Sequence, residues 1–414
     1  MESSNSPADQ SREAGGKEPS SGGELAKQIM KRVSDDLSFT LFACKSLTIL
    51  PSGTTNFVFR GTLHDASMIE TPDSNGRATR PRKVETVVVK VIEGYARLNP
   101  AIRIDIRRGP FEASMLRVLN SFAMTSLSIG VRAPRLLDVV QAKNTLVIED
   151  FGPDCVDLKD LFLNADNGTS LEYMRSLGEW LRGFHDWTVQ EEQRHLREAM
   201  KECEESGRFK RDLMYGSIPD LCDKVGLLDD ETWDILRQVD ELLAREFEDS
   251  KTGHTTDDWG PIHGDFWTGN ILNPNRKDCP ENPDLSVVDW EFAHLGLRAY
   301  DLGQMVGDLI EKYEVSGYLI FKRAIDSLVE GYGRVSRKMA FRILIHAGVQ
   351  LVNWHIRGPT VGLSDDGILR IVKMGRDMIE WGLKENEQWF RDRGLGRILD
   401  LTYVVPLAAY MVEE

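Results

Sequence analysis

The sequence predicts an α+β fold, with a small strand-rich part followed by a larger, mainly helical part. Strand-like apolar runs separated by turn residues fill roughly the first 150 residues after a polar tail. From Thr169 onward, apolar residues recur at helical spacing instead. With 414 residues, 41% of them hydrophobic, the chain can bury a core and build two lobes.

The N-terminal segment predicts a tail, a helix and a hairpin. Residues 1–23 are rich in Ser, Gly and charge, so we expect them to be a disordered polar tail. A short helix is expected over residues 25–37. The strand-like runs CKSLTIL and NFVFRGTL flank the turn-forming PSGTT, which is typical of a β-hairpin.

Further strands and one helix complete the first part. Residues 65–83 are polar and turn-rich, so they predict an exposed loop before a third strand in VETVVVKVIE. The charged run IRIDIRRG predicts a solvated face. Phe111, Met115 and Val118 have helical spacing, and the runs PRLLDVV and NTLVIED predict two more strands.

The second part begins with a strong helical signal. Thr169 and Glu172 fit a capping box ahead of an apolar stripe. The remainder predicts helices, interrupted near PIHGDFWTGNIL and DLSVVDW. The apolar C-terminal run ILDLTYVVPLAAYM is interrupted by Asp400 and Pro406, so we expect it to pack on the body or at a dimer contact.

Composition excludes several classes of function. Acidic side chains outnumber basic ones by 66 to 51, and the net charge of −15 opposes binding to nucleic acid. The five cysteines are scattered without a CxxC pair, so neither a disulfide framework nor a zinc site is indicated. We expect a cytoplasmic protein with no membrane partner, because no run is long and apolar enough to span a bilayer and the N-terminus is polar.

Two short segments carry the chemistry. Asp265 and Asn270 lie five residues apart in HGDFWTGN, and Asp289 ends the apolar run SVVD. Phosphoryl transfer needs hard oxygen ligands for magnesium and one carboxylate facing the attacking hydroxyl. These three side chains supply both, although Asp265 and Asn270 could instead brace a buried turn.

Lys90 lies within the apolar run VVVKVI. A buried ammonium is costly unless an anion pairs with it, and phosphate oxygens and Glu112 are the candidates. Glu112 falls at the edge of the apolar face of its predicted helix, since Leu116 lies four residues later. The alternatives are a snorkelling lysine on an edge strand and an ordinary solvated glutamate.

The ordered set PSGTTNFVFRG, Lys90, Glu112, VIEDFG, HGDFWTGN, VVDWE and YDLGQMVGDL resembles the aminoglycoside phosphotransferase and choline kinase family of small-molecule kinases. The resemblance covers residues 30–385, and its finer features are similar to fungal members related to methylthioribose kinase and hydroxytryptamine kinase. It implies a two-lobed, protein-kinase-like fold. The nucleotide-binding lobe would span residues 24–150, and the catalytic and substrate lobe residues 151–414.

The resemblance also implies site residues. ATP and Mg²⁺ would be the cofactors, and the partner would be a small-molecule hydroxyl substrate of a monomer or homodimer. Asp265 would be the catalytic base, and Asn270 and Asp289 would ligate the metal. The implied nucleotide-binding residues are Gly53, Thr54 and Asn56 over the phosphates, Lys90 with Glu112 behind it, and the main chain of Glu149 to Phe151 at the adenine.

The sequence departs from protein kinases in ways that narrow the substrate. Gly264 stands in place of the arginine of their H-R-D motif, and neither D-F-G nor A-P-E occurs. A protein substrate is therefore not expected. A site combining Asp265, Glu291 and Asp301 with Trp267, Trp290 and Trp354 would suit a cationic amino alcohol.

Supporting roles are expected for other polar residues. His185 and His263 are predicted to be packed, hydrogen-bonded supports, and Asp301 is predicted to brace the catalytic loop. For Glu291, two roles stay open, one near the metal and one in contact with the substrate.

Two functions of other classes compete. A metallophosphoesterase could use HGD and GHT as metal-ligand fragments, but its other motifs are missing from the sequence. A catalytically silent, nucleotide-binding pseudokinase scaffold is the alternative that keeps the fold. Loss of the base or of a metal ligand usually marks such a protein, and here all are present.

Overall fold

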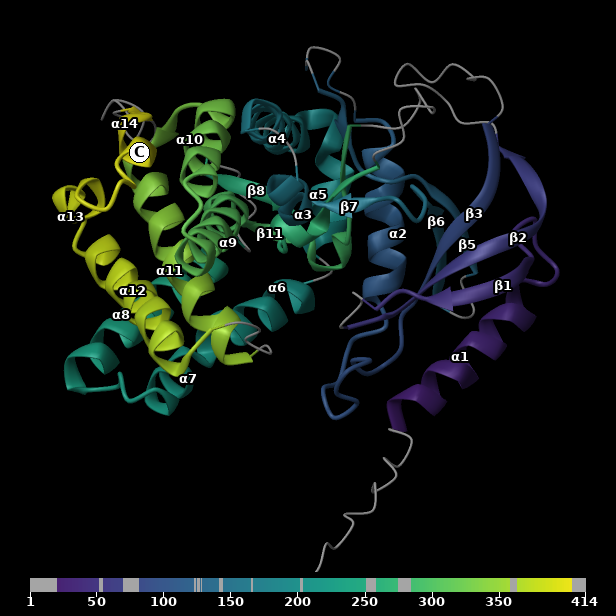
Figure 1. Cartoon of the computed structure of the whole chain (residues 1–414), viewed down its shortest axis with the longest axis horizontal. Helices are drawn as coiled ribbons and strands as arrows, with labels where there is room; N and C mark the ends of the chain where they lie inside the picture. The colour runs from purple at the N-terminus through teal and green to yellow at the C-terminus, as the bar shows by residue number, and fades with distance from the viewer. Residues whose placement is uncertain are drawn as a thin grey trace, which may run out of the picture.

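The computed structural model describes residues 21–51, 55–69, 82–122, 124, 127, 129–140, 144–164, 167–201, 204–250, 258–274, 284–357 and 363–403. Figure 1 shows a sheet-containing N-terminal part beside a larger, mostly helical part. The predicted fold class, α+β with an antiparallel sheet in the small part, is confirmed.

The N-terminal part is built on one five-stranded antiparallel sheet in the order β1-β2-β3-β6-β5. The strands are β1 (Cys44–Ile49), β2 (Phe57–Ile69), β3 (Arg82–Val91), β5 (Leu136–Val140) and β6 (Thr145–Glu149). Helix α1 (Ser21–Leu37) packs on one face of this sheet (Figure 1).

The side chains of β3 alternate between the two faces of the sheet. Val87, Val89 and Val91 are fully buried in a core shared with α1. Because successive side chains of a strand point to opposite faces, Val88 and Lys90 face the other way. That second face forms one wall of a cavity described below. A strand with both faces covered accounts for its nearly continuous run of valines.

Helix α2 (Arg108–Leu119) joins the sheet to the rest of the molecule. It contacts β5 and β6 on one side and the short helix η5 (Trp290–Phe292) on the other. Figure 1 shows it between the sheet and the helical part. Buried residues of α2 and β6 belong to the same hydrophobic core as the C-terminal helices, so the two parts share one core.

The C-terminal part is held together by pairs of long helices. Helix α4 packs on α10, and α11 packs on both α9 and α12. The helices described there are α3 (Leu158–Asn164), α4 (Asn167–Thr188), α5 (Arg194–Lys201), α6 (Glu204–Arg211), α7 (Ile218–Lys224), α8 (Asp230–Ser250), α9 (Ala299–Ser316), α10 (Ile320–Tyr332), α11 (Arg337–Arg357), α12 (Asp365–Leu383), α13 (Glu387–Arg391) and α14 (Arg397–Asp400), with a 3-10 turn η2 (Glu191–Gln193) and a π-helical turn η3 (Asp212–Gly216).

Short strands carry the loops that matter for function. A small sheet has the order β4-β10-β9-β7, and a two-stranded ribbon pairs β8 with β11. Their bounds are β4 (Val131–Arg132), β7 (Val156–Asp157), β8 (Trp259–Ile262), β9 (Ile271–Asn273), β10 (Leu285–Val287) and β11 (His294–Leu297), and η4 (Thr268–Asn270) precedes β9. A parallel pair, β12 (Val335–Ser336) and β13 (Thr402–Tyr403), lies near the C-terminus.

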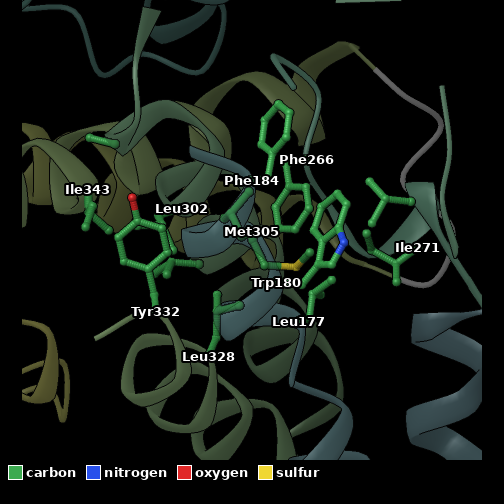
Figure 2. Close-up of a cluster of buried hydrophobic side chains, with 14 of the residues drawn as sticks. Leu177, Trp180, Phe184, Phe266, Ile271, Leu302, Met305, Leu328, Tyr332 and Ile343 are labelled. Carbon is green, nitrogen blue, oxygen red and sulfur yellow. The ribbon is translucent and has the colours of Figure 1, made fainter. Parts of the chain in front are cut away.

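A large apolar cluster supports these loops from beneath. Phe266, within the HGDFWTGN segment, and Ile271, directly after it, are fully buried among side chains of α4, α9 and α10 (Figure 2). Trp180 and Phe184 of α4 stack at 5.8 Å between ring centroids. These two buried residues anchor the segment and help to fix its polar side chains in place.

Several expected boundaries differ from the structure. Helix α4 begins at Asn167, so the capping box at Thr169 is wrong, and Thr169 lies inside the helix. Part of the predicted loop over residues 65–83 is strand instead. Residues 65–69 belong to β2 and residues 82–83 to β3, because these two strands pair beyond their apolar runs. Helix α1 begins at Ser21, within the predicted tail, and residues 1–20 lie outside the described residues.

Two further expectations concern the apolar C-terminal run and membrane-spanning helices. Ile398 and Leu399 are buried, so the start of the C-terminal apolar run packs on the body as expected, whereas residues 404–414 lie outside the described residues. Within the described part of the chain, no helix has the length and apolar character needed to cross a membrane.

Candidate active site

The two polar segments lie side by side. Asp265 and Asn270 belong to the segment between β8 and β9, and Asp289 lies two residues after the end of β10. Strand β9 pairs with β10, and the backbone N–H of Val288 donates to the carbonyl of Asn270 at 2.9 Å. Strand pairing therefore brings together two segments that are separated in the sequence.

Asp265 is held by three side chains. The amide of Asn270 donates to both the carbonyl and Oδ2 of Asp265, at 2.9 Å in each case. Lys210 of α6 and Gln304 of α9 donate to Oδ1 at 2.6 and 2.8 Å. Because Nδ2 of Asn270 points to Asp265, its carbonyl oxygen Oδ1 is the atom that can accept a cation.

The protonation state of Asp265 follows from these contacts. Burial alone would raise the pKa of Asp265. The positive charge of Lys210 and the hydrogen bonds from Lys210 and Gln304 outweigh burial, so the pKa is lowered from its ordinary value. The carboxylate is thus ionised at neutral pH and can accept a hydrogen bond or a proton.

A buried carboxylate braces the loop. Asp301 accepts hydrogen bonds from the backbone N–H groups of His263 and Gly264 at 2.8 and 2.9 Å, and it contacts His185 at 3.2 Å. His185 also contacts the hydroxyl of Tyr332 at 2.9 Å. Asp301, His185 and His263 are fully buried, so their expected supporting roles are confirmed.

Two residues adopt left-handed backbone conformations at the turning points. Gly264 has a φ of 77°, and a Cβ there would lie 2.2 Å from the carbonyl oxygen of Phe292, so only glycine fits. Asp289 has a φ of 67° without being glycine. A strained backbone at a non-glycine residue is typical of functional sites.

Lys90 lies at the centre of an ionic cluster. Its Nζ is 2.8 Å from Glu112, 2.5 Å from Asp289 and 3.1 Å from Glu291. Lys90 is 5% exposed and Glu112 2% exposed, so the ammonium is buried and paired rather than snorkelling. The expected pairing of Lys90 with Glu112 is present.

The cluster has more negative than positive charge. Burial disfavours the ammonium of Lys90, but Asp289, Glu112 and Glu291 outweigh it and raise its pKa. Burial raises the pKa of Glu112 to about 7, against the opposing effect of Lys90. Three carboxylates share the two cations Lys90 and Arg108. The surplus negative charge favours a bound cation.

Glu291 belongs to the ionic cluster rather than to an acceptor pocket. Besides Lys90, it accepts a hydrogen bond from the amide of Asn56 and pairs with Arg108 at 2.7 Å. The guanidinium of Arg108 also lies 4.3 Å from the ring centroid of Phe292. Arg108 is 5% exposed, so the prediction of a solvated face is wrong at this position.

A cavity of about 300 Å³ opens between the sheet and the catalytic loops. Apolar side chains of β2, β3, β6 and α2 form much of its wall. Its lining includes most of the predicted site residues, namely Asn56, Lys90, Glu112, Glu149, Phe151, Asn270 and Asp289. Gly53 and Thr54 lie outside the described residues.

Glu149 and Phe151 lie at the end of the cavity beside β6. The backbone N–H of Glu149 donates to the carbonyl of Arg135 at 2.9 Å, and its carboxylate binds Arg132 at 2.6 Å. The side chain of Glu149 is therefore a structural partner. Asp150, which pairs with Arg60 at 2.8 Å, was not predicted, although it stands in the quoted VIEDFG.

A second, smaller cavity of about 40 Å³ is lined by residues of α6, η3, β8, β11, α9 and α11. Lys210 and Gln304, which bind Oδ1 of Asp265, line this cavity, whereas Asn270, which binds Oδ2, lines the larger one. The carboxylate of Asp265 thus hydrogen-bonds residues that line both cavities.

The expected amine-binding cluster does not form as predicted. Asp301 and Trp290 are fully buried, and Glu291 is part of the ionic cluster. Trp267 lines the larger cavity, and the side chain of Trp354 lies outside the described residues. The spacing of acids and tryptophans did not reveal which of them face a cavity.

Two residues at Asp265 were missed. Lys210 stands in the charged run RFKRD, which resembles a solvated helix face. Gln304 carried a weak signal, since it is a polar residue within the buried face of α9, three positions after Asp301.

Comparison with known proteins shows the family of this chain. The model of the phosphotransferase enzyme family matches residues 95–340, more than half of the chain. The phosphotransferase FrzJ of Cladobotryum sp. is 24% identical over 383 residues, which cover 88% of this chain and 93% of that protein.

Solved structures that are similar to this chain include two kinases. An amicoumacin kinase is 11% identical with a TM-score of 0.48, and the match covers 87% of this chain and 96% of that one. A choline kinase from Cryptosporidium parvum is 11% identical with a TM-score of 0.47, covering 93% and 99%. The family match confirms the predicted enzyme class: this chain belongs to the phosphotransferase enzyme family.

Proposed function

We propose that this protein transfers the γ-phosphate of ATP to a hydroxyl group of a small molecule. In this proposal Asp265 is the base, and Asn270 and Asp289 hold Mg²⁺. Residues 24–150 would form the nucleotide-binding lobe, and residues 151–414 the catalytic and substrate lobe. The single observation that carries it is that Asp265 hydrogen-bonds Asn270, which lines the larger cavity together with Lys90 and Asp289, and also Lys210 and Gln304, which line the smaller one.

The larger cavity suits a nucleotide. Its apolar wall, formed in part by Val58, Val88 and Ile148, would pack on adenine, and Glu149 to Phe151 would offer main-chain groups to the base. The backbone N–H of Glu149 is already bonded to Arg135, so its carbonyl is the group left for adenine. Lys90 would bind the α- and β-phosphates, with Glu112 holding its ammonium in place.

The residues present fit a magnesium ion. Asn270 offers an amide oxygen and Asp289 a carboxylate, and hard oxygen donors are what Mg²⁺ prefers. No cluster of three or more His, Cys, Asp or Glu suited to a metal occurs among the residues that the structure describes. Two protein ligands fit an ion whose other ligands are phosphate oxygens and water. When bound, the ion would neutralise charge on the phosphates.

The chain supplies the proton transfer. The acceptor hydroxyl would donate a hydrogen bond to the ionised Asp265, its oxygen would attack the γ-phosphorus, and its proton would pass to Asp265 as ADP leaves. Asn270, Lys210 and Gln304 keep the carboxylate oriented. Orientation by fixed hydrogen bonds is the main contribution that a protein makes to this chemistry.

A pseudokinase scaffold is disfavoured by the same geometry. The base, both metal ligands and the lysine–glutamate pair are all present, and their side chains converge. A protein that had lost catalysis would have no need to keep Asp265 ionised and oriented by three side chains.

ADP release tests the proposal. The purified full chain is assayed with ATP and Mg²⁺ across amino alcohols, sugars, hydroxy acids, indoles and aminoglycosides, beside the Asp265→Ala variant. We expect acceptor-dependent ADP release that falls by at least about 100-fold in the variant. Equal rates in the two proteins would contradict the role of Asp265, and ADP release that no acceptor stimulates would contradict acceptor phosphorylation.

A further inference from the structure

The smaller cavity is made by elements of the C-terminal part alone. Lys210 and Arg211 reach it from α6, Tyr215 from the π-helical turn η3, and His346 and Gln350 from α11. Short π-helical segments are frequent at functional sites because they redirect side chains within a helix. Its volume of about 40 Å³ accommodates a small polar group rather than a whole substrate.

Three residues that line this cavity each carry a buried polar atom without a hydrogen-bond partner among the described residues. The atoms are Nε of Arg211, Nε2 of His346 and Nε2 of Gln350. His346 is 3% exposed and Gln350 2% exposed. Because buried polar atoms are almost always bonded, three such residues around one small cavity favour a bound ligand or water that supplies their partners.

The unpartnered atoms determine which ligand chemistry fits. The guanidinium of Arg211 and the side-chain amide nitrogen of Gln350 are donors only, so they require acceptor oxygens. The Nδ1 atom of His346 already contacts the hydroxyl of Tyr215. Burial and Arg342 hold the pKa of His346 well below its ordinary value, so its ring is neutral.

The electrostatics of the cavity disfavour a positively charged group. Among the residues that the structure describes, no carboxylate lines it, while Lys210 and Arg211 do. Lys210 is paired with Oδ1 of Asp265, so its ammonium stands between the cavity and this carboxylate oxygen. Arg211 pairs with Asp240 at 2.9 Å, outside the cavity lining, so the described charges that line the cavity are positive.

We infer that the phosphate acceptor is a hydroxy compound that carries a carboxylate, carbonyl or hydroxyl oxygen a few bonds from its reacting hydroxyl and has no positive charge there. This inference rests on the proposed function. The oxygen-bearing group would enter the cavity and bind Arg211 and Gln350, and the rest of the molecule would lie outside the cavity. The ammonium of Lys210 would exclude organic cations from Asp265.

A series of acceptors matched in shape tests this selectivity. The probes are 3-(hydroxymethyl)benzoate, 1,3-benzenedimethanol and 3-(aminomethyl)benzyl alcohol, together with 4-hydroxybutyrate, 1,4-butanediol and 4-amino-1-butanol. Binding to the full chain loaded with Mg²⁺ and AMP-PNP is measured by ligand-observed NMR. Phosphorylation with ATP is measured by phosphorus NMR. We expect the acidic or neutral members to exceed the cationic member of each set by at least about tenfold in affinity and in kcat/KM.

A near-isosteric variant gives the sharper result. Gln350→Glu replaces a donor with a carboxylate of similar shape, so the preference should shift toward the cationic members by at least about tenfold. Arg211→Met should weaken the acidic members by a similar factor. Gln238→Glu, on the exposed face of α8, is the matched control and should leave the preference unchanged.

The outcomes separate this inference from the proposed function. Tighter binding of the cationic members overturns the inference, and so does a Gln350→Glu variant with unchanged preference. The inference is also overturned if no acidic or neutral probe binds the nucleotide-loaded protein, since the cavity then holds water only. The proposed function fails if AMP-PNP itself does not bind, or if the acidic and neutral probes bind but are not phosphorylated. In either case, the relative binding of acidic, neutral and cationic probes still tests the inferred charge preference of the smaller cavity.

Discussion

The side-chain amide of Asn270 donates two hydrogen bonds of 2.9 Å to Asp265, one to its backbone carbonyl and one to Oδ2. This contact fixes the orientation of both residues at once. It turns the amide oxygen of Asn270 away from Asp265, where it can serve a cation, and it leaves Oδ1 of Asp265 toward Lys210 and Gln304. One pair of residues thereby couples the proposed metal site to the proposed base.

Replacing the base should remove turnover and spare nucleotide binding. We expect Asp265→Asn to lower kcat by about 100- to 10,000-fold, because the amide cannot take the hydroxyl proton. Dissociation constants for a fluorescent nucleotide analogue should change little. The control Asp234→Asn changes an exposed residue of α8 in the same way. A variant that keeps more than a tenth of wild-type kcat would contradict the assignment.

Removing the ammonium of the ionic cluster should destabilise the fold. Lys90→Met leaves three carboxylates facing one another, and breaking a buried pair costs about 3–5 kcal/mol. The double variant Lys90→Met, Glu112→Gln removes one of these charges, so it should recover part of the loss. Urea denaturation measures the free energy of unfolding of each variant. Additive effects of the two changes would show that Lys90 and Glu112 are not coupled.

Disturbing the buried brace should affect both stability and rate. Asp301→Asn has one acceptor oxygen for two backbone N–H groups and brings an amide donor toward them, which costs about 1–3 kcal/mol per unpaired group. We expect a lower melting temperature, and a lower kcat because the loop that carries Asp265 loses its support. Thermal unfolding and ADP release are measured on the same preparation. An Asp301→Asn protein as stable as Asp234→Asn would rule out the bracing role.

A buried histidine should make stability depend on pH. His346 is neutral in the folded protein, but its unfolded-state pKa is near 6.5, so the unfolded chain binds more protons in acid. The stability linked to His346 is present above pH 6.5 and is lost as the pH falls below it, by up to about 2 kcal/mol at pH 5. The difference in free energy of unfolding between wild type and His346→Gln should shrink accordingly between pH 7.5 and pH 5.

The control for this experiment is His195→Gln, a substitution on an exposed part of α5. Its difference from wild type should stay constant across the same pH range. A wild type and a His346→Gln variant with parallel pH profiles would show that His346 is not forced to remain neutral by the fold.

Local sequence patterns predicted the elements that depend on local rules. The apolar run VETVVVKVIE predicted strand β3, and the cost of a buried ammonium predicted the contact between Lys90 and Glu112. The segments proposed to be catalytic stood out in the sequence because their polar residues interrupt apolar runs. Boundaries such as the start of α4 at Asn167 were missed, since the helix begins before its apolar stripe.

Contacts between distant segments could not be predicted in this way. Lys210 reaches Asp265 only because α6 folds over the loop that follows β8, and nothing near Lys210 in the sequence signals that approach. Arg108 stands in a charged run that looks solvated, yet it is buried against Glu291. Asp301 and Trp290 were grouped with the acceptor site by residue type, although tertiary packing buries both.

The central claim concerns the position of a metal-bound nucleotide relative to three side chains. A crystal structure of the full chain with Mg²⁺ and AMP-PNP measures it directly. We expect the ion within about 2.0–2.1 Å of the Asn270 amide oxygen and an Asp289 carboxylate oxygen, with the terminal phosphate facing Asp265. A nucleotide bound outside the larger cavity, or an ion with neither Asn270 nor Asp289 among its ligands, would contradict the account.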